Sequence, residues 1–474
     1  MDPRTKRADE LKFLPKKLKM AIIKEIKKIA LPFVLVLLFG NIVLSENLLL
    51  TQETGMSEQI KKIRKEAVKW LSAQIVPNTT IPLPAPYRRR LILSYRIPSS
   101  SSVYPHLFGR SFIYDNALAI IAFTMVKDYQ KAEYILGALM RLLSDDGSLW
   151  SAYNTNNSWP SNLDHQGAIK RLGAIAWVGY SAVYYLGKRL ETDKAHLEQD
   201  VLAADYLEFA KKIARFIISR QVMEPSDKRY GLITGGSATL FLKVSEDFNK
   251  IMENYNPAPI YWISTEHNID AYFFIRDLGR ITGDGEYIKK ADLIKKGLLK
   301  IWSKNDSQFF RGIKETQRID QFLPLDGASW GAFFLFSLGE DEKATQCLKA
   351  TNNFFTISKG IKGYAPYYKE TVYENDRVNQ FYYREKPNMT WRDLNLVWVE
   401  GSLGVAAAFI RAGNFEKGAA IINAMMRMQD GGGFQYASIE IPFQFSIFPS
   451  VASTAWFVIA TELYLNQDKL FWGN

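Results

Sequence analysis

The sequence has few of the residues that build disulfides and metal centres. It contains one cysteine, Cys347, and four histidines, and the histidines do not recur at the short spacing typical of metal ligands. One cysteine cannot form a disulfide within the chain, and Cys347 lies in a helical pattern, where a small buried apolar residue is expected. The sequence therefore predicts no catalytic metal.

Two signatures of other enzyme classes are also missing. The chain has no glycine-rich phosphate-binding loop of the kind that holds nucleotides, and no G-x-S-x-G motif of the kind that carries a nucleophilic serine. We therefore expect no cofactor and no serine hydrolase chemistry.

The positive charge is unevenly distributed. The net charge is +11, and residues 1–28 hold ten Lys and Arg against four acids, which gives +6 from that stretch alone. A basic cluster directly ahead of an apolar run favours contact with a membrane surface over contact with nucleic acid.

That apolar run covers 29–44, and its 16 residues fall just short of the roughly 20 needed to cross a bilayer as a helix. We predict an uncleaved signal-anchor over 29–50; a cleaved secretory signal or a buried soluble helix are the alternatives. With lysines on its N-terminal side, residues 1–28 are expected in the cytoplasm and the rest outside, at the cell surface or in the periplasm.

Beyond residue 56 two kinds of helical segment alternate. Six are nearly free of charge, which predicts burial on all sides, and they cover 115–126, 167–186, 266–278, 327–338, 400–410 and 450–463. Six are amphipathic, which predicts an outer layer, and they cover 57–72, 129–143, 200–220, 285–302, 341–355 and 414–428. The pattern predicts an all-α domain over 56–474, an (α/α)6 toroid of six helical hairpins.

The segments that follow the outer helices combine glycine-rich turns with aromatic residues, as in 145–150 and 429–437. In a toroid these connections meet at one face, together with the N-termini of the inner helices. The longest connection, 222–263, contains a possible pair of strands.

Four short motifs at the starts of inner helices resemble those of the (α/α)6 six-hairpin glycosidases and related bacterial proteins. They are YDNALA (114–119), STEHNID (264–270), WVEGSLGV (398–405) and PSVASTAW (449–456). The resemblance covers about 86–474 and implies a toroid that hydrolyses polysaccharides, although a shared fold does not establish the activity.

Carboxylates are rare in the inner segments and lie at or beside their starts: Asp115, Asp164, Glu266, Asp270, Asp326 and Glu400. Acids at helix starts also cap free amides and interact favourably with the helix dipole, and this alone would explain Asp115 or Asp326. A ring, however, brings these ends together, and crowded carboxylates perturb one another's pKa values.

Glu266 is the strongest catalytic candidate. Ser264 or Thr265 can cap its helix, so capping does not require the glutamate. Asp270 follows four residues later and shares its helix face. We predict Glu266 as the general acid, because burial beside aromatic rings raises the pKa of a carboxyl.

The general base is predicted to be Glu400 or Asp115. Two carboxylates on different inner helices fit the wide separation that an inverting glycosidase needs to admit a water molecule. Further sugar contacts are predicted from residues near the helix starts, with flat aromatic rings stacking on sugars; they are Trp150, Trp159, Asp164, His165, Trp262, His267, Asn268, Asp270, Trp330, Trp391 and Tyr436.

The sequence thus predicts an inverting glycoside hydrolase acting on an extracytoplasmic polysaccharide or oligosaccharide. His267 beside Glu266 leaves open a polysaccharide lyase or sugar epimerase, which must remove a proton from carbon. The remaining alternative is a non-catalytic glycan-binding scaffold.

Overall fold

The computed structural model describes residues 55–101, 103–158, 167–197, 201–244, 251–373, 388–441 and 444–473. The chain divides into two units, 1–61 and 62–474. In the first unit the described residues, 55–61, are helical. The predicted basic segment 1–28 and the predicted anchor 29–50 lie outside the described residues. None of the described helices has the length and apolar character needed to span a membrane.

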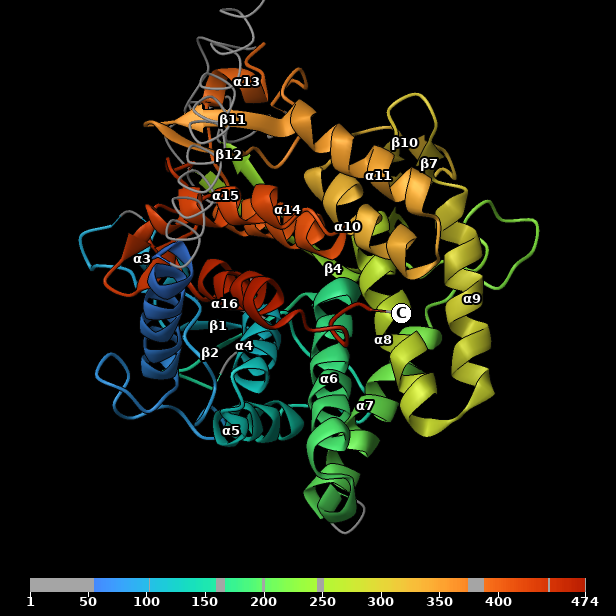
Figure 1. Ribbon diagram of the computed structural model, residues 1–474. Coiled ribbons are helices and arrows are strands. Elements are labelled where there is room, and N and C mark those ends of the chain that lie inside the picture. Colours follow the sequence, from blue (N-terminus) through green and yellow to red (C-terminus); the bar gives the residue numbers. More distant parts are fainter. Residues whose placement is uncertain are drawn as a thin grey trace, which may run out of the picture. The chain divides into compact units, whose positions relative to one another are not determined.

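Six helices form a closed inner ring in the second unit (Figure 1). Each contacts the next in the order α4, α6, α8, α10, α14, α16, and α16 returns to contact α4. Their bounds are Ile113–Met125 for α4, Leu172–Leu197 for α6, Thr265–Thr282 for α8, Leu325–Ser337 for α10, Val399–Arg411 for α14 and Val451–Asn466 for α16. These helices correspond to the six charge-poor segments of the sequence.

An outer helix packs on each inner helix. Five of them follow their inner partner in the chain: α5 (Tyr129–Met140), α7 (Val201–Ile218), α9 (Gly285–Leu299), α11 (Asp341–Ala350) and α15 (Phe415–Met426). The sixth is the helix at 62–74, whose Arg64 forms an ion pair with Glu462 of α16. The predicted (α/α)6 toroid is therefore confirmed for this unit.

The two layers differ in burial as the sequence pattern requires. Every residue of α16 from Val451 to Leu463 is buried, whereas on α9 burial is confined to one stripe that includes Ala291, Ile294 and Leu298. An apolar helix surface stays out of water only when other elements cover all of it, and the inner position provides that cover.

Short antiparallel sheets occupy the connections between hairpins, and the all-α prediction included only one strand pair among them. They are β1 (Arg110–Phe112) with β2 (Ala152–Asn154); β3 (Lys170–Arg171), β4 (Gly236–Val244) and β5 (Ile251–Ile260); β6 (Ile263–Ser264), β9 (Gly312–Ile313) and β10 (Ile319–Asp320); β7 (Trp302–Ser303) with β8 (Gln308–Phe309); β11 (Phe355–Ser358) with β12 (Ile361–Tyr364); and β13 (Gln429–Asp430), β14 (Gly433–Gln435) and β15 (Pro449–Ser450). β4 and β5 are the strand pair expected within 222–263.

Several strands lead directly into an inner helix. β1 ends where α4 begins, β3 where α6 begins, β6 where α8 begins and β15 where α16 begins. Pairing satisfies the backbone groups of these connections and holds each helix start in a defined place. The first-turn side chains are thereby positioned.

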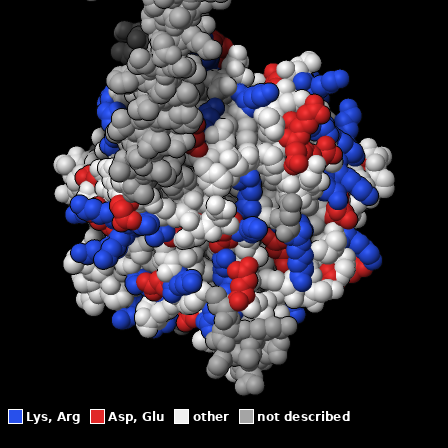
Figure 2. Space-filling model, in the orientation of Figure 1, with Lys and Arg blue, Asp and Glu red and all other residues white. Residues whose placement is uncertain are grey.

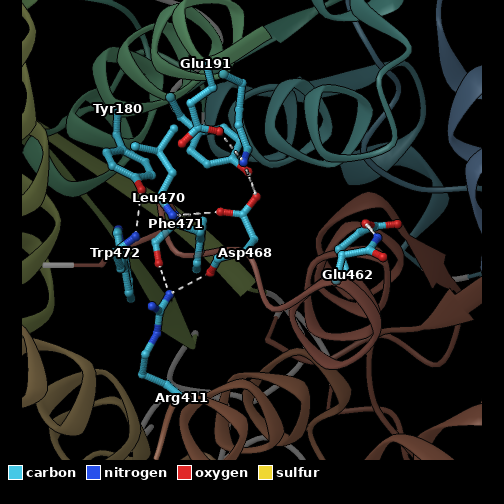
Figure 3. Close-up of polar contacts among 11 residues, drawn as sticks. Tyr180, Glu191, Arg411, Glu462, Asp468, Leu470, Phe471 and Trp472 are labelled. Atoms are coloured by element: carbon cyan, nitrogen blue, oxygen red, sulfur yellow. Dashed lines mark hydrogen bonds and ion pairs between the residues drawn. The ribbon is translucent and has the colours of Figure 1, made fainter.

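After α16 the chain turns back into the ring (Figures 1 and 3). Phe471 and Trp472 are fully buried, and the backbone N–H of Trp472 donates to the Tyr180 hydroxyl at 2.9 Å. Arg411, at the C-terminal end of α14, donates to the carbonyl oxygens of Asp468 and Phe471. The segment therefore closes the ring at the end where the inner helices finish.

The outer surface carries charges of both signs. Figure 2 shows acidic and basic side chains interspersed on the face of Figure 1, without a continuous field of one sign. Ion pairs along the outer helices include Lys289 with Glu286 and Lys295 with Asp292. Exposed pairs of this kind contribute little to stability.

Candidate active site

The starts of the inner helices surround a cavity of about 1070 Å³. Side chains from the first turns of α4, α6, α8, α10 and α14 line it, with loop residues ahead of α8 and α16. The lining includes Tyr114, Arg171, Trp177, Trp262, Glu266, His267, Asp270, Asp326, Trp330, Trp398, Glu400 and Tyr436.

Four carboxyl groups from the inner helices face this cavity: Glu266, Asp270, Asp326 and Glu400. Burial raises the pKa of Glu266 to about 7 and the pKa of Glu400 to about 8. Burial, and then the charge of Glu266, raises the pKa values of Asp270 and Asp326 well above their usual range. Carboxyls whose charges raise one another's pKa values titrate as a group, so protonated and ionised forms coexist near neutral pH. Acid–base catalysis requires this combination.

Glu400 is held in a fixed orientation. The Tyr114 hydroxyl donates to Glu400 Oε1 and accepts a hydrogen bond from the indole nitrogen of Trp456 at 3.0 Å. The hydrogen bond from Tyr114 lowers the pKa of Glu400 and so offsets part of the effect of burial. This contact favours the ionised form of Glu400.

The carboxyl of Glu266, unlike that of Glu400, is not held by a hydrogen bond from the described residues. Ser264 caps α8 by accepting from the backbone N–H of His267 at 3.3 Å, and the Thr265 hydroxyl donates to the Phe310 carbonyl at 2.6 Å. Glu266 therefore has no capping role, as the sequence suggested. Its half-buried carboxyl faces the cavity, and no hydrogen bond connects it to the described residues.

His267 lies beside Glu266 in the same wall, with its ring 5.8 Å from the ring of Trp262. Burial, and then the charge of Arg171, lowers the pKa of His267 to about 3, so the imidazole is neutral. Its Nδ1 has no hydrogen-bond partner in the part of the chain that the structure describes. The side chain can therefore donate or accept a hydrogen bond when a ligand is present.

Aromatic rings form the floor of the cavity. Trp177 and Trp330 lie 5.8 Å apart between ring centroids, and Trp330 stacks on Trp456 at 5.9 Å. Trp472 packs beneath them, 5.0 Å from Trp177 and 5.3 Å from Trp330. The segment that closes the ring, part of which Figure 3 draws, thus also supports the floor of the site.

Asp115 lies outside the cavity lining, although it follows Tyr114 directly. It is 4% exposed, and burial raises its pKa to about 7, an effect partly offset by a hydrogen bond from Ser94. Of the two candidates for the base, the structure brings Glu400 to the cavity and places Asp115 behind the wall.

Three predicted sugar contacts also lie outside the cavity. Asn268 bonds to the backbone N–H and carbonyl of Ile233, because its side chain leaves the helix on the other face from Glu266. The ammonium nitrogen of Lys170 lies over the Trp150 ring, 5.0 Å from the ring centroid. Trp391 is buried against Tyr373 and Phe445. These three positions are corrections to the predicted set of contacts.

Other predicted residues divide into two groups. Trp262, His267, Asp270, Trp330 and Tyr436 all line the cavity together with Glu266 and Glu400. Trp159, Asp164 and His165 lie outside the described residues.

The sequence interpretation missed several lining residues. Asp326 was attributed to helix capping, but Pro324 is the N-cap of α10 and no side-chain cap is present. Tyr114, Trp177 and Arg171 carried no signal beyond proximity to helix starts. No cluster of three or more potential metal ligands occurs within the described ranges.

Similarity to known proteins rests on structure. No protein-family profile matches the sequence, and comparison with curated proteins found no relative. Among solved structures, a D-mannose isomerase aligns at TM-score 0.56 and 9% identity, covering 87% of this chain and 98% of that chain. A mannosylglycerate hydrolase of family GH63 from Thermus thermophilus aligns at TM-score 0.56 and 13% identity, covering 84% and 99%. A GH76 α-mannanase from Bacteroides thetaiotaomicron aligns at 0.52 and 10%, covering 86% and 97%. The chain shares its fold with these sugar-processing enzymes.

Proposed function

We propose that the protein is a glycoside hydrolase that cleaves a polysaccharide or oligosaccharide. The observation that carries the proposal is the group of four carboxyls with raised pKa values in a cavity floored by tryptophans. A glycosidase needs one protonated and one ionised carboxyl beside a sugar, and aromatic rings stack on the C–H faces of sugars. The GH63 and GH76 hydrolases with this fold support the assignment.

Glu266 is proposed as the general acid and Glu400 as the general base. None of the described residues donates a hydrogen bond to the Glu266 carboxyl that would favour its ionised form, whereas Tyr114 donates one to Glu400. The pKa of Glu400, about 8, is nevertheless higher than that of Glu266, about 7, because burial, and then the charges of Asp115 and Glu266, raise it. The charge of Glu266 disappears when Glu266 holds the proton. The assignment therefore takes Glu266 as the protonated partner and Glu400, oriented by Tyr114, as the ionised one.

We propose inversion as the stereochemical course. The two glutamates lie on α8 and α14, which are separated in the ring by α10. An inverting pair must leave room for a water molecule between the base and the sugar, which takes a separation of about 6.5–9.5 Å. Action outside the cytoplasm remains part of the proposal and rests on the basic and apolar N-terminal sequence.

The test uses the full-length protein and a panel of polysaccharides with detection of new reducing ends. Glu266→Gln and Glu400→Gln are expected to lower turnover by about 100-fold or more while preserving the fold, since acid–base catalysis supplies about that much. Glu416→Gln, on the exposed face of α15, is the matched control and should leave turnover unchanged. Turnover that survives both cavity substitutions would overturn the proposal.

The roles can then be separated. On a glycosyl fluoride of the hydrolysed sugar, whose leaving group needs no protonation, Glu266→Gln should regain most of its rate. Glu400→Gln should not. NMR of the first product shows inversion or retention directly.

Isomerisation or epimerisation of a sugar is the second candidate. It is favoured by the neutral imidazole of His267 beside Glu266 and by the D-mannose isomerase with the same fold. Conversion of a free sugar without any gain in reducing ends would identify it. A lyase would instead leave an unsaturated sugar that absorbs in the near ultraviolet. Glycan binding with no turnover would identify a scaffold.

A further inference from the structure

Arg171 is a cation in the wall of the cavity. It ends β3, directly ahead of α6, and its half-buried side chain lines the cavity beside Trp262 and His267. The guanidinium lies 5.9 Å from the centroid of the Trp262 ring. Arg171 therefore lies next to the wall that carries Glu266.

One backbone contact holds the guanidinium in place. Its Nη1 donates to the carbonyl oxygen of Ala238 at 2.5 Å. The pairing of β4 with β5 shifts register at Ala238, where two residues of β5 lie opposite this one residue of β4. Ala238 has a φ of 65°, a left-handed conformation that is unfavourable for alanine. Bulges reorient backbone groups next to functional sites, and here the carbonyl of Ala238 accepts the hydrogen bond from Arg171.

Arg171 has no acidic partner among the described residues. Its pKa is lowered to about 10 by burial alone, and no carboxylate contributes to the shift. Arg311, which also lines the cavity, differs because it forms an ion pair with Asp320 at 2.8 Å. A half-buried guanidinium without a counter-ion is costly, and it has five N–H donors, of which this backbone contact uses one.

We propose that Arg171 binds an anionic group of the substrate, so that the cavity accepts an acidic sugar. A guanidinium binds carboxylate or phosphate through two parallel hydrogen bonds. The Trp262 ring beside it offers a surface for the sugar itself. Lys314 and Arg318, both exposed at the cavity mouth, outnumber the exposed Glu315 there and leave a net positive charge among these three residues. The inference rests on the proposed function only in assuming that a sugar occupies the cavity.

The test measures binding and not turnover. Full-length protein is titrated with D-glucuronate, D-glucose 6-phosphate and D-glucose, and binding is followed by calorimetry. The anionic sugar that fits is expected to bind about 10- to 100-fold more tightly than D-glucose, as charge-assisted hydrogen bonds would provide. The first two ligands distinguish a carboxylate from a phosphate substituent.

Arg171→Gln should abolish this preference, and Arg171→Lys should retain part of it, because lysine keeps the charge but lacks the planar pair of donors. The control is Arg215→Gln, which removes the same charge from the exposed face of α7, outside the cavity lining, and should leave the preference intact. Should Arg171→Gln fail to fold, the comparison of wild type with Arg171→Lys carries the test.

The proposal is overturned if the wild type binds D-glucose as tightly as both anionic sugars, or if Arg215→Gln loses the preference as fully as Arg171→Gln. Its outcome is independent of hydrolysis. A protein that prefers acidic sugars but cleaves no glycan would refute the hydrolase proposal and leave this inference standing. A protein that hydrolyses neutral glycans and shows no preference for acidic sugars would refute this inference and leave the hydrolase proposal standing.

Discussion

Replacing Trp472 with alanine is expected to destabilise the toroid strongly. The side chain is 1% exposed and packs among aromatic rings that include Phe273, Trp177, Trp330 and Phe333, with ring centroids at 4.8, 5.0, 5.3 and 5.5 Å. The alanine variant keeps the backbone hydrogen bond to Tyr180 but leaves a cavity within the ring. Such cavities persist because the surrounding helices relax only partly.

The size of the effect follows from the area that the ring buries. An aromatic side chain buries roughly 150–250 Å², which at about 25 cal/mol per Å² gives about 4–6 kcal/mol. Residual burial in the unfolded chain reduces this by about 10–40%, to about 2–5 kcal/mol. Measured losses for buried Trp→Ala substitutions fall in the same range, about 3–5 kcal/mol.

The assay is unfolding in urea, followed by circular dichroism, with Leu83→Ala as the control. Leu83 is 87% exposed, so its truncation should change the free energy of unfolding by no more than about 0.5 kcal/mol. Ligand affinity should also fall in Trp472→Ala, because Trp177 and Trp330 lose their support. A loss of less than about 1 kcal/mol would show that the segment after α16 does not pack inside the ring.

Three further changes test the electrostatics and geometry of the site. Tyr114→Phe removes the hydrogen bond that lowers the pKa of Glu400, so the acidic limb of the pH profile of kcat/KM should move to higher pH. Gly173→Ala adds a Cβ that would overlap the ring of His267, and isothermal titration should show ligand binding weakened by about 10-fold or more. Asp115 has a pKa raised from 3.8 to about 7, so the native state favours the protonated acid. Its contribution to stability is complete below about pH 4 and is lost as the pH rises through about 7, and the loss is about 4 kcal/mol at most. Asp115→Asn should flatten this part of the curve of unfolding free energy against pH; a curve that keeps its slope would contradict the raised pKa.

The ring of helices could be predicted because the distribution of apolar and charged residues in each segment indicates how much of that segment is buried. A run such as 450–463 has no polar face, so it must be covered on all sides, and α16 is. The strands were harder to predict. Most have only two to four residues, too short for an alternating pattern, and β3 consists of Lys170 and Arg171 alone.

The lining of the cavity could be predicted only in part, because successive residues of a helix point about 100° apart. Tyr114 faces the cavity and Asp115 does not; His267 faces it and Asn268 does not. Spacing along one helix can be read from the sequence, which is why Glu266 and Asp270 were correctly placed on a common face. The rotation of that helix about its own axis relative to its neighbours cannot be read from the sequence, because this rotation depends on packing across the ring.

Asp326 shows what an acid at a helix start can indicate. A capping acid stabilises its helix through free backbone amides, and this explanation sufficed while only the sequence was considered. In the structure the N-cap is Pro324, and one carboxylate oxygen of Asp326 is buried with no partner in the described part of the chain. A carboxyl that costs stability in this way, beside Glu266 and Glu400, is better explained by the chemistry of the cavity than by the helix. The substitution Asp326→Asn should therefore raise stability at neutral pH, whereas loss of a cap would lower it.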